Sequence, residues 1–237
     1  MPMALVLLGA GGLAREAIEA TRPSCGDHAR IPGGQRGFVH DHGGVGGLLD
    51  DDPAKHGSTV GGVRVLGPTG SVGELDPQVR LIAAVASSAD PGRRARLVRR
   101  LGLAPARYGR IVHPRAALAS STRLGVGVIV LANVVATCDV TVGAHVVVMP
   151  GCVLTHDVDL GDGCTLASGV QLAGGVVVEP EAYLGTGATV REGVRIGAGA
   201  VVGMGAVVLR DVPPGEVWVG SPAAPIRRSG PEPGRPA

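Results

Sequence analysis

The C-terminal half of this chain repeats one pattern every six residues. From Val112 onward, each sixth residue is aliphatic or alanine at seventeen positions without an insertion. These positions are Val112, Leu118, Leu124, Val130, Ala136, Val142, Val148, Leu154, Leu160, Leu166, Leu172, Val178, Leu184, Val190, Ile196, Val202 and Val208. Uninterrupted hexapeptide repeats are typical of a parallel β-helix, in which each coil buries its apolar face on its neighbours. We therefore predict five to six coils over residues 112–212, ending near Pro213 and Pro214.

The composition fits a core of small aliphatic side chains. Glycine accounts for 40 of 237 residues, but many of these glycines follow the six-residue repeat, and 45% of the residues are hydrophobic. A formal charge of +2 implies no nucleic acid and no membrane as a partner. The apolar N-terminal run is too short for a signal peptide or a membrane span, which favours a cytoplasmic location. Cys152 and Cys164 fall on small inward positions, so we expect buried thiols rather than disulfides or metal ligands.

The N-terminal part predicts a different fold. A strand over 4–8, a glycine turn over 9–12 and a helix over 13–21 open a Rossmann-like unit. Gly9, Gly11 and Ala14 also match the loose dinucleotide fingerprint, where glycine lets the backbone approach a phosphate at a helix N-terminus. No acidic residue closes a second strand in the usual way, so NAD binding is only an alternative.

The remaining segments complete a division of the chain near residue 105. Residues 22–47 are rich in Gly and Pro and predict a flexible loop; 80–85 predict a strand. Residues 91–101 predict a basic helix, whose arginines we interpret as a solvated face rather than an anion site. The predicted units are a Rossmann-like domain over 1–105, a β-helix domain over 106–226 and a disordered tail over 227–237.

Three hexapeptides form one triangular coil, so residues eighteen apart stack at about 4.8 Å, the usual strand spacing. Because side chains alternate along a strand, three outward columns result. The first is Ile129, Val147, Thr165, Tyr183 and Val201; the second is Ala117, Val135, Val153, Gln171, Thr189 and Val207; the third is Arg123, Thr141, Asp159, Val177 and Arg195. The first two are mainly apolar and predict a partner surface, which a cyclic homotrimer would bury.

His156 lies at the turn between the second and third faces, and Gly174 follows one coil later in the same column. A histidine can accept a proton near neutral pH, and a backbone N–H at Gly174 could hold a carbonyl oxygen as charge builds on it. This pair suits acyl transfer to an amine or a hydroxyl. Asp157 stacks on Asp139, and either carboxylate could orient the imidazole or simply be solvated. No Cys or Ser lies at this turn, so direct transfer without an acyl-enzyme is expected.

Several motifs together resemble one known family, the NeuD/PglD family of bacterial sugar O- and N-acyltransferases. The motifs are residues 6–16 (VLLGAGGLARE), 50–53 (DDDP), 61–63 (GGV), 65–67 (VLG), 113–114 (HP), 156–157 (HD), 172–174 (LAG), 203–208 (GMGAVV) and 219–223 (VGSPA). The resemblance implies a left-handed β-helix, a trimer, and acetyl-CoA in the groove between neighbouring helices. It further implies His156 as general base and contact of the Gly174 amide with the thioester carbonyl. We separately expect that the reaction needs no metal.

The resemblance also implies that the N-terminal domain holds part of a sugar or nucleotide-sugar acceptor. Gly9, Gly11, Gly12 and Asp51 are the candidate contacts. The chain departs from the family at Leu13 and Thr165, where some members have histidine, and at Met149, where asparagine is frequent. We keep Thr165 as a candidate substrate contact. These departures affect recognition of the acceptor more than the reaction.

Other functions on a β-helix fit the sequence less well. A carbonic anhydrase needs three histidine ligands, and His145 and His156 are neither stacked nor joined by a third. A sugar nucleotidyltransferase needs a phosphate loop with catalytic basic residues, whereas Leu13 and Ala14 follow the glycine turn. An inactive hexapeptide-repeat scaffold stays open, as do the identity of the acceptor and the choice between nitrogen and oxygen.

Overall fold

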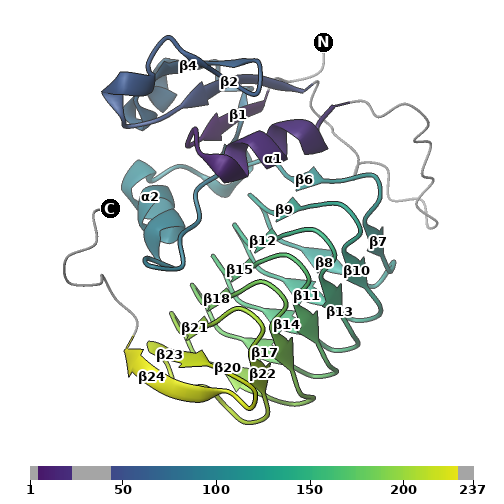
Figure 1. Ribbon diagram of the computed structural model, residues 1–237. Coiled ribbons are helices and arrows are strands. Elements are labelled where there is room, and N and C mark those ends of the chain that lie inside the picture. The colour runs from purple at the N-terminus through teal and green to yellow at the C-terminus, as the bar shows by residue number, and fades with distance from the viewer. Residues whose placement is uncertain (1–4, 23–43, 229–237) are drawn as a thin grey trace.

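A computed structural model describes residues 5–22 and 44–228 (Figure 1). The N-terminal part is a five-stranded sheet of order β3-β4-β2-β1-β5, parallel except for the β3–β4 pair. Its strands are β1 (Leu5–Leu8), β2 (Val45–Leu49), β3 (Thr59–Val60), β4 (Val63–Gly67) and β5 (Arg80–Ala83). The helices are α1 (Gly12–Ala20), α2 (Arg93–Leu101) and three short 3₁₀ helices, η1 (Pro53–Lys55), η2 (Thr69–Glu74) and η3 (Pro105–Arg107).

The predicted strands and helices of this part are confirmed to within two residues at most of their ends, the usual uncertainty of element boundaries. The predicted loop over 22–47 is wrong at its C-terminal end, because β2 begins at Val45. The strand was missed because its two glycines resemble those of a loop. Gly47 lies in the ladder opposite Val6, and a Cβ there would stand 2.5 Å from Leu66 Cδ1. Residues 23–43 lie outside the described part of the chain.

From residue 111 the chain forms a parallel β-helix of two-residue strands. Each of the seventeen repeated aliphatic positions is the second residue of one such strand, as predicted. The strands are β6 (Ile111–Val112), β7 (Ala117–Leu118), β8 (Arg123–Leu124), β9 (Ile129–Val130), β10 (Val135–Ala136), β11 (Thr141–Val142), β12 (Val147–Val148), β13 (Val153–Leu154), β14 (Asp159–Leu160), β15 (Thr165–Leu166), β16 (Gln171–Leu172), β17 (Val177–Val178), β18 (Tyr183–Leu184), β19 (Thr189–Val190), β20 (Arg195–Ile196), β21 (Val201–Val202) and β22 (Val207–Val208). They stack into three sheets, with each residue paired to the one eighteen positions later, as Val135 pairs with Val153. Cys152 and Cys164 are fully buried free thiols inside the coils, as predicted.

The β-helix continues past its predicted end. Val212 bridges to Ile196, and β23 (Glu216–Val219) then pairs in parallel with β21. β24 (Ala224–Arg228) pairs antiparallel with β23 and covers that open edge. The predicted tail over 227–237 is therefore wrong for its first two residues, which belong to β24; residues 229–237 lie outside the described part.

The first two residues of the first outward column that follow β6 are covered by the chain itself. Ile129 and Val147 are fully buried and pack in one hydrophobic cluster with Ala14 and Ile18 of α1. In Figure 1, α1 lies between the N-terminal sheet and the first coils. Assigning these two residues to a subunit interface was wrong, because periodicity shows that a face is apolar but not what covers it. The second column stays open to solvent, with Val153 half-buried and Gln171 exposed.

Helix α2 connects the two parts of the chain through its arginines. Arg94 is 1% exposed, so the predicted solvated face is wrong at this residue. Arg99 forms an ion pair with Glu181 of the β-helix at 2.8 Å, and Arg100 pairs with Asp51 at 2.6 Å.

No helix in the described ranges is long and apolar enough to cross a membrane.

Candidate active site

The side chains of His156 and Asp157 contact each other at the turn that follows β13. Asp157 Oδ2 lies 2.8 Å from His156 Nδ1, and both side chains are about two-thirds exposed. A carboxylate at Nδ1 keeps the proton on that nitrogen, so the Nε2 lone pair is left to accept a proton. Of the two carboxylates considered from the sequence, Asp157 is therefore the one that contacts the ring.

Gly174 lies directly beneath the imidazole, one coil away. A Cβ at position 174 would stand 2.2 Å from His156 Cε1 and 2.3 Å from Nε2, so only glycine leaves room for the ring. The Gly175 N–H donates to the His156 carbonyl at 2.9 Å and fixes the two turns together. The Gly174 N–H has no hydrogen-bond partner within residues 5–22 and 44–228, and it is free to donate to a ligand. The predicted juxtaposition of the His156 ring and the Gly174 amide is present.

The glycines of the turn over 9–12 have two different roles: Gly9 is needed for packing, whereas Gly11 and Gly12 are exposed. Gly9 has φ +108°, and a Cβ there would stand 2.6 Å from Val85 Cγ1, so this glycine serves the packing of the turn against the end of β5. Gly11 and Gly12 are exposed at the start of α1, and a Cβ at either would meet nothing within 4 Å. Only these two leave space for a ligand.

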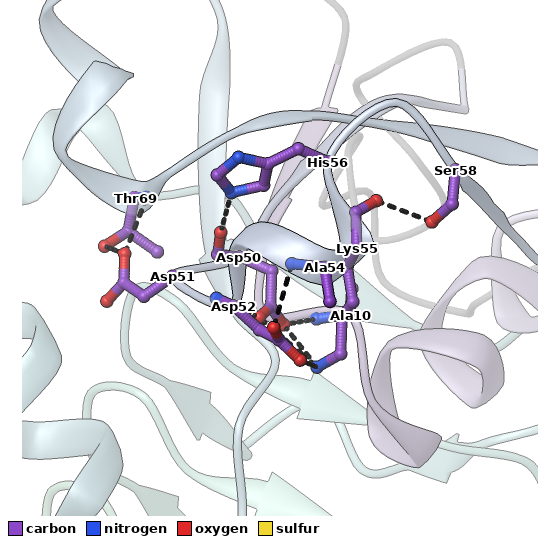
Figure 2. A network of polar contacts seen from close by, with 9 residues as sticks. All are labelled: Ala10, Asp50, Asp51, Asp52, Ala54, Lys55, His56, Ser58 and Thr69. Atoms are coloured by element: carbon purple, nitrogen blue, oxygen red, sulfur yellow. Dashed lines mark hydrogen bonds and ion pairs between the residues drawn. The ribbon is translucent and has the colours of Figure 1, made fainter.

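Asp50, rather than Asp51, reaches the glycine turn (Figure 2). Asp50 Oδ2 accepts from the Ala10 N–H at 2.7 Å and lies 3.2 Å from Lys55 Nζ. Partial burial alone would raise the pKa of Asp50, but hydrogen bonds from Asp52, Ala10 and Lys55 outweigh it and lower that pKa. Sequence reasoning treated Asp50 only as part of a motif; its place directly after a buried strand was the signal that could have identified it.

Asp51 points away from the glycine turn and joins β2 to η2 and α2. Its Oδ1 accepts from the Thr69 N–H at 2.9 Å and from the Thr69 hydroxyl at 2.6 Å, and its Oδ2 pairs with Arg100. Partial burial raises the pKa of Asp51, but these hydrogen bonds prevail and lower it to about 2. Both oxygens are already engaged, which disfavours Asp51 as a substrate contact.

A pocket of about 320 Å³ lies between α1 and the first face of the β-helix. It is lined by Gly12, Leu13, Glu16, Ala86, Met149, Thr165, Ala167, Ser168, Tyr183 and Thr186. The pocket unites the predicted contacts Gly12 and Thr165 with both remaining departures from the family pattern, Leu13 and Met149. Partial burial raises the pKa of the Glu16 carboxyl, against a smaller opposing effect of Arg15.

The predicted site residues thus fall into two groups within one chain. His156, Asp157 and Gly174 lie at the edge between the second and third faces, whereas Gly12 and Thr165 lie in the pocket on the first face. Gly9, Gly11 and Asp51 line neither. Within the described ranges, no group of three or more His, Cys, Asp or Glu side chains is arranged to hold a metal ion.

Comparison with known proteins agrees with this geometry. The family model described as bacterial transferase hexapeptide (six repeats) matches residues 139–174, a span that includes both His156 and Gly174. No curated protein matches the chain.

Solved structures match over nearly the whole chain. PerB from Caulobacter crescentus, in complex with CoA and GDP-perosamine, is 34% identical, with a TM-score of 0.77 over 94% of this chain and 97% of that chain. The acetyltransferase domain of PglB from Neisseria gonorrhoeae, in complex with acetyl coenzyme A, is 26% identical, with a TM-score of 0.78 over 95% of this chain and 100% of that chain. WeeI from Acinetobacter baumannii, at 22% identity and a TM-score of 0.64 over 94% of this chain and 100% of that chain, supports the fold alone.

A Rossmann-like α/β domain followed by a left-handed parallel β-helix, with a histidine over a glycine amide, defines a hexapeptide-repeat acyltransferase. The chain belongs to the NeuD/PglD-type family of sugar acyltransferases.

Proposed function

We propose that the protein transfers the acetyl group of acetyl-CoA to the amine of a nucleotide-linked amino sugar, with His156 as the general base. The observation that carries this proposal is the His156 ring, oriented by Asp157 at 2.8 Å and seated against Gly174. The relatives support the reactants: PerB was solved with CoA and GDP-perosamine, and the PglB domain with acetyl-CoA. Because related structures include a GDP-perosamine N-acetyl transferase, we favour nitrogen over oxygen as the atom that is acylated.

The reaction follows from the geometry in two steps. The nitrogen of the acceptor amine attacks the thioester carbon while His156 Nε2 takes a proton from that amine. Negative charge builds on the carbonyl oxygen, where the free Gly174 N–H can donate to it. The intermediate then collapses, the C–S bond breaks, and the departing CoA thiolate takes the proton from the imidazolium. Asp157 stabilises that imidazolium between the two proton transfers.

A homotrimer is part of the proposal because one chain does not bring its two groups of site residues together. The pocket and His156 are separated by the second face of the same β-helix, and the mainly apolar outward column on this face stays open to solvent in the single chain. Packing of that face against a neighbour would place the pocket of one subunit close to His156 of another. Replacing half-buried Val153 by Glu would put a charge in this interface and dissociate it. Light scattering should give a trimeric mass for the wild type and a lower mass for Val153→Glu.

The central experiment incubates the protein with acetyl-CoA and a panel of GDP- and UDP-linked amino sugars, with matched hydroxy sugars as controls. We expect CoA release with an amino sugar and a product heavier by one acetyl group. Acylation of the hydroxy sugars alone would move the assignment from nitrogen to oxygen. No CoA release with any acceptor, from protein that binds acetyl-CoA, would favour the inactive scaffold. Binding of NAD instead of acetyl-CoA would favour the dinucleotide alternative.

A further inference from the structure

Among the described residues, Arg94 is the charged side chain that is fully buried. It is 1% exposed, and no carboxylate forms an ion pair with it in the described part of the chain. Its Nη1 donates to the Val85 carbonyl at 2.8 Å, and its Nη2 lies 2.8 Å from the carbonyls of Gly163 and Cys164. A buried cation held only by neutral acceptors is costly, so its position needs an explanation beyond packing.

One of the Arg94 contacts reaches the pocket wall. Nη2 also lies 2.7 Å from Thr165 Oγ1, and Thr165 is 5% exposed and lines the pocket. A hydroxyl has one proton to donate, and an arginine can only donate. The Thr165 oxygen therefore acts as the acceptor toward Arg94, and its proton is left for another partner. Thr165 donates to no other group in the described ranges.

The α1 wall of the pocket offers hydrogen-bond acceptors, whereas Thr165 on the β-helix offers a donor. Glu16 of α1 lines the same space and offers carboxylate oxygens, which accept hydrogen bonds and repel phosphate. A volume of about 320 Å³ is also at the small end of the usual range for ligand pockets, roughly 300–1,000 Å³, and suits a sugar ring better than a whole nucleotide-sugar. The pocket therefore fits a group that carries an oxygen to accept from Thr165 and a hydroxyl or ammonium to donate to Glu16.

We propose that Arg94 is a positioning residue: it fixes the Thr165 oxygen as its acceptor and leaves the hydroxyl proton to point to the ligand, so that the pocket favours an acceptor sugar with an oxygen at that point. Glu16 accepts from a hydroxyl or ammonium on the other side of the ring. This inference rests on the proposed function for the identity of the ligand, but not for the direction of the hydrogen bond. It adds Arg94 and Glu16 to the acceptor site, neither of which the sequence pattern identified.

Thr165→Val is the direct test, since valine keeps the shape and removes the hydroxyl. With GDP-perosamine as the probe, we expect its KM to rise about tenfold or more, with kcat and the KM for acetyl-CoA little changed. Thr165→Ser should restore most of the affinity. Thr141→Val is the matched control, because Thr141 Oγ1 also accepts from an arginine, Arg123 at 2.8 Å, but lies on the third face away from the pocket.

The role of Arg94 is tested by a double-mutant cycle. Arg94→Lys keeps a charge but not the planar fork, so it should raise the same KM; combined with Thr165→Val, it should add little further, because both act through one hydroxyl. Fully additive effects on KM would overturn the positioning role. If Arg94→Lys does not fold, Thr165→Val against Thr165→Ser still decides whether the hydroxyl is needed.

Calorimetric binding of GDP-perosamine without acetyl-CoA separates this inference from the proposed function. Binding that weakens in Thr165→Val supports the inference even if no acetyl transfer occurs. Transfer with an unchanged KM in Thr165→Val overturns the inference and leaves the function standing. If the wild type neither binds GDP-perosamine nor acetylates it, both the inference and the proposed function are overturned.

Discussion

The imidazole of His156 occupies the space that a side chain at Gly174 would need. This relationship joins two residues eighteen positions apart, the length of one coil, and it places the proposed base beside the amide that we propose donates to the thioester oxygen.

Gly174→Ala should therefore damage catalysis without damaging the fold. The new methyl group would stand 2.2 Å from His156 Cε1, and the ring must move to avoid it. A displacement of about 1 Å can cost about 10²-fold in rate, and we expect a fall in kcat of that order at an unchanged melting temperature. Gly70→Ala is the control, because a Cβ there meets nothing within 4 Å. Equal kcat values for the two variants would show that ring position does not matter.

Asp157→Asn tests whether the carboxylate orients the base. Asp157 has φ +58°, a left-handed conformation that asparagine also tolerates, so the turn should persist. An amide can donate to Nδ1 and so favours the wrong tautomer, with the proton on Nε2. We expect kcat to fall by about 10–10²-fold, part of the 10²–10⁴-fold that a general base supplies. Steady-state kinetics at saturating acetyl-CoA would measure it, and full activity would mean that Asp157 is only a solvated turn residue.

Asp51→Asn should change acid stability rather than catalysis. The pKa of Asp51 is lowered to about 2 in the folded protein, against an ordinary value of 3.8. A carboxyl with a lowered folded pKa contributes stability above its unfolded pKa and loses it as the pH falls through the folded value. The difference in melting temperature between wild type and Asp51→Asn should thus be present at pH 5 and shrink between pH 4 and pH 2.

The size of this effect is limited by exposure. The Asp51 side chain is 49% exposed and that of Arg100 59%, so solvent screening keeps the contribution of the pair at about 1 kcal/mol or less. Arg100→Gln should reproduce part of the change. A melting-temperature difference that stays constant from pH 5 to pH 2 would contradict the role of the carboxylate.

The sequence was informative where the structure is periodic. The six-residue repeat located all seventeen strands, and its eighteen-residue coil predicted that Gly174 would lie by His156. Both follow from local geometry, because a β-helix residue is placed mainly by its neighbours one coil away.

The parts that could not be predicted depend on contacts between distant segments. We predicted a subunit interface at Ile129 and Val147 because no local sequence pattern shows that α1 covers them. Arg94 read as solvated because its acceptors are backbone carbonyls near residue 164, which have no sequence signature. Asp50 and Asp51 are neighbours of equal chemistry, and only the fold decides which faces the glycine turn.

The central claim is that His156 removes the proton from the acceptor amine, and His156→Ala tests it most directly. Turnover of acetyl-CoA with the amino sugar that the wild type accepts should fall by about 10²–10⁴-fold, the usual cost of losing a general base. The affinity for CoA and the mass in solution should stay the same, because the side chain is 63% exposed at a turn and belongs to no hydrophobic core. Full turnover by His156→Ala on that acceptor would contradict the account and place the base elsewhere.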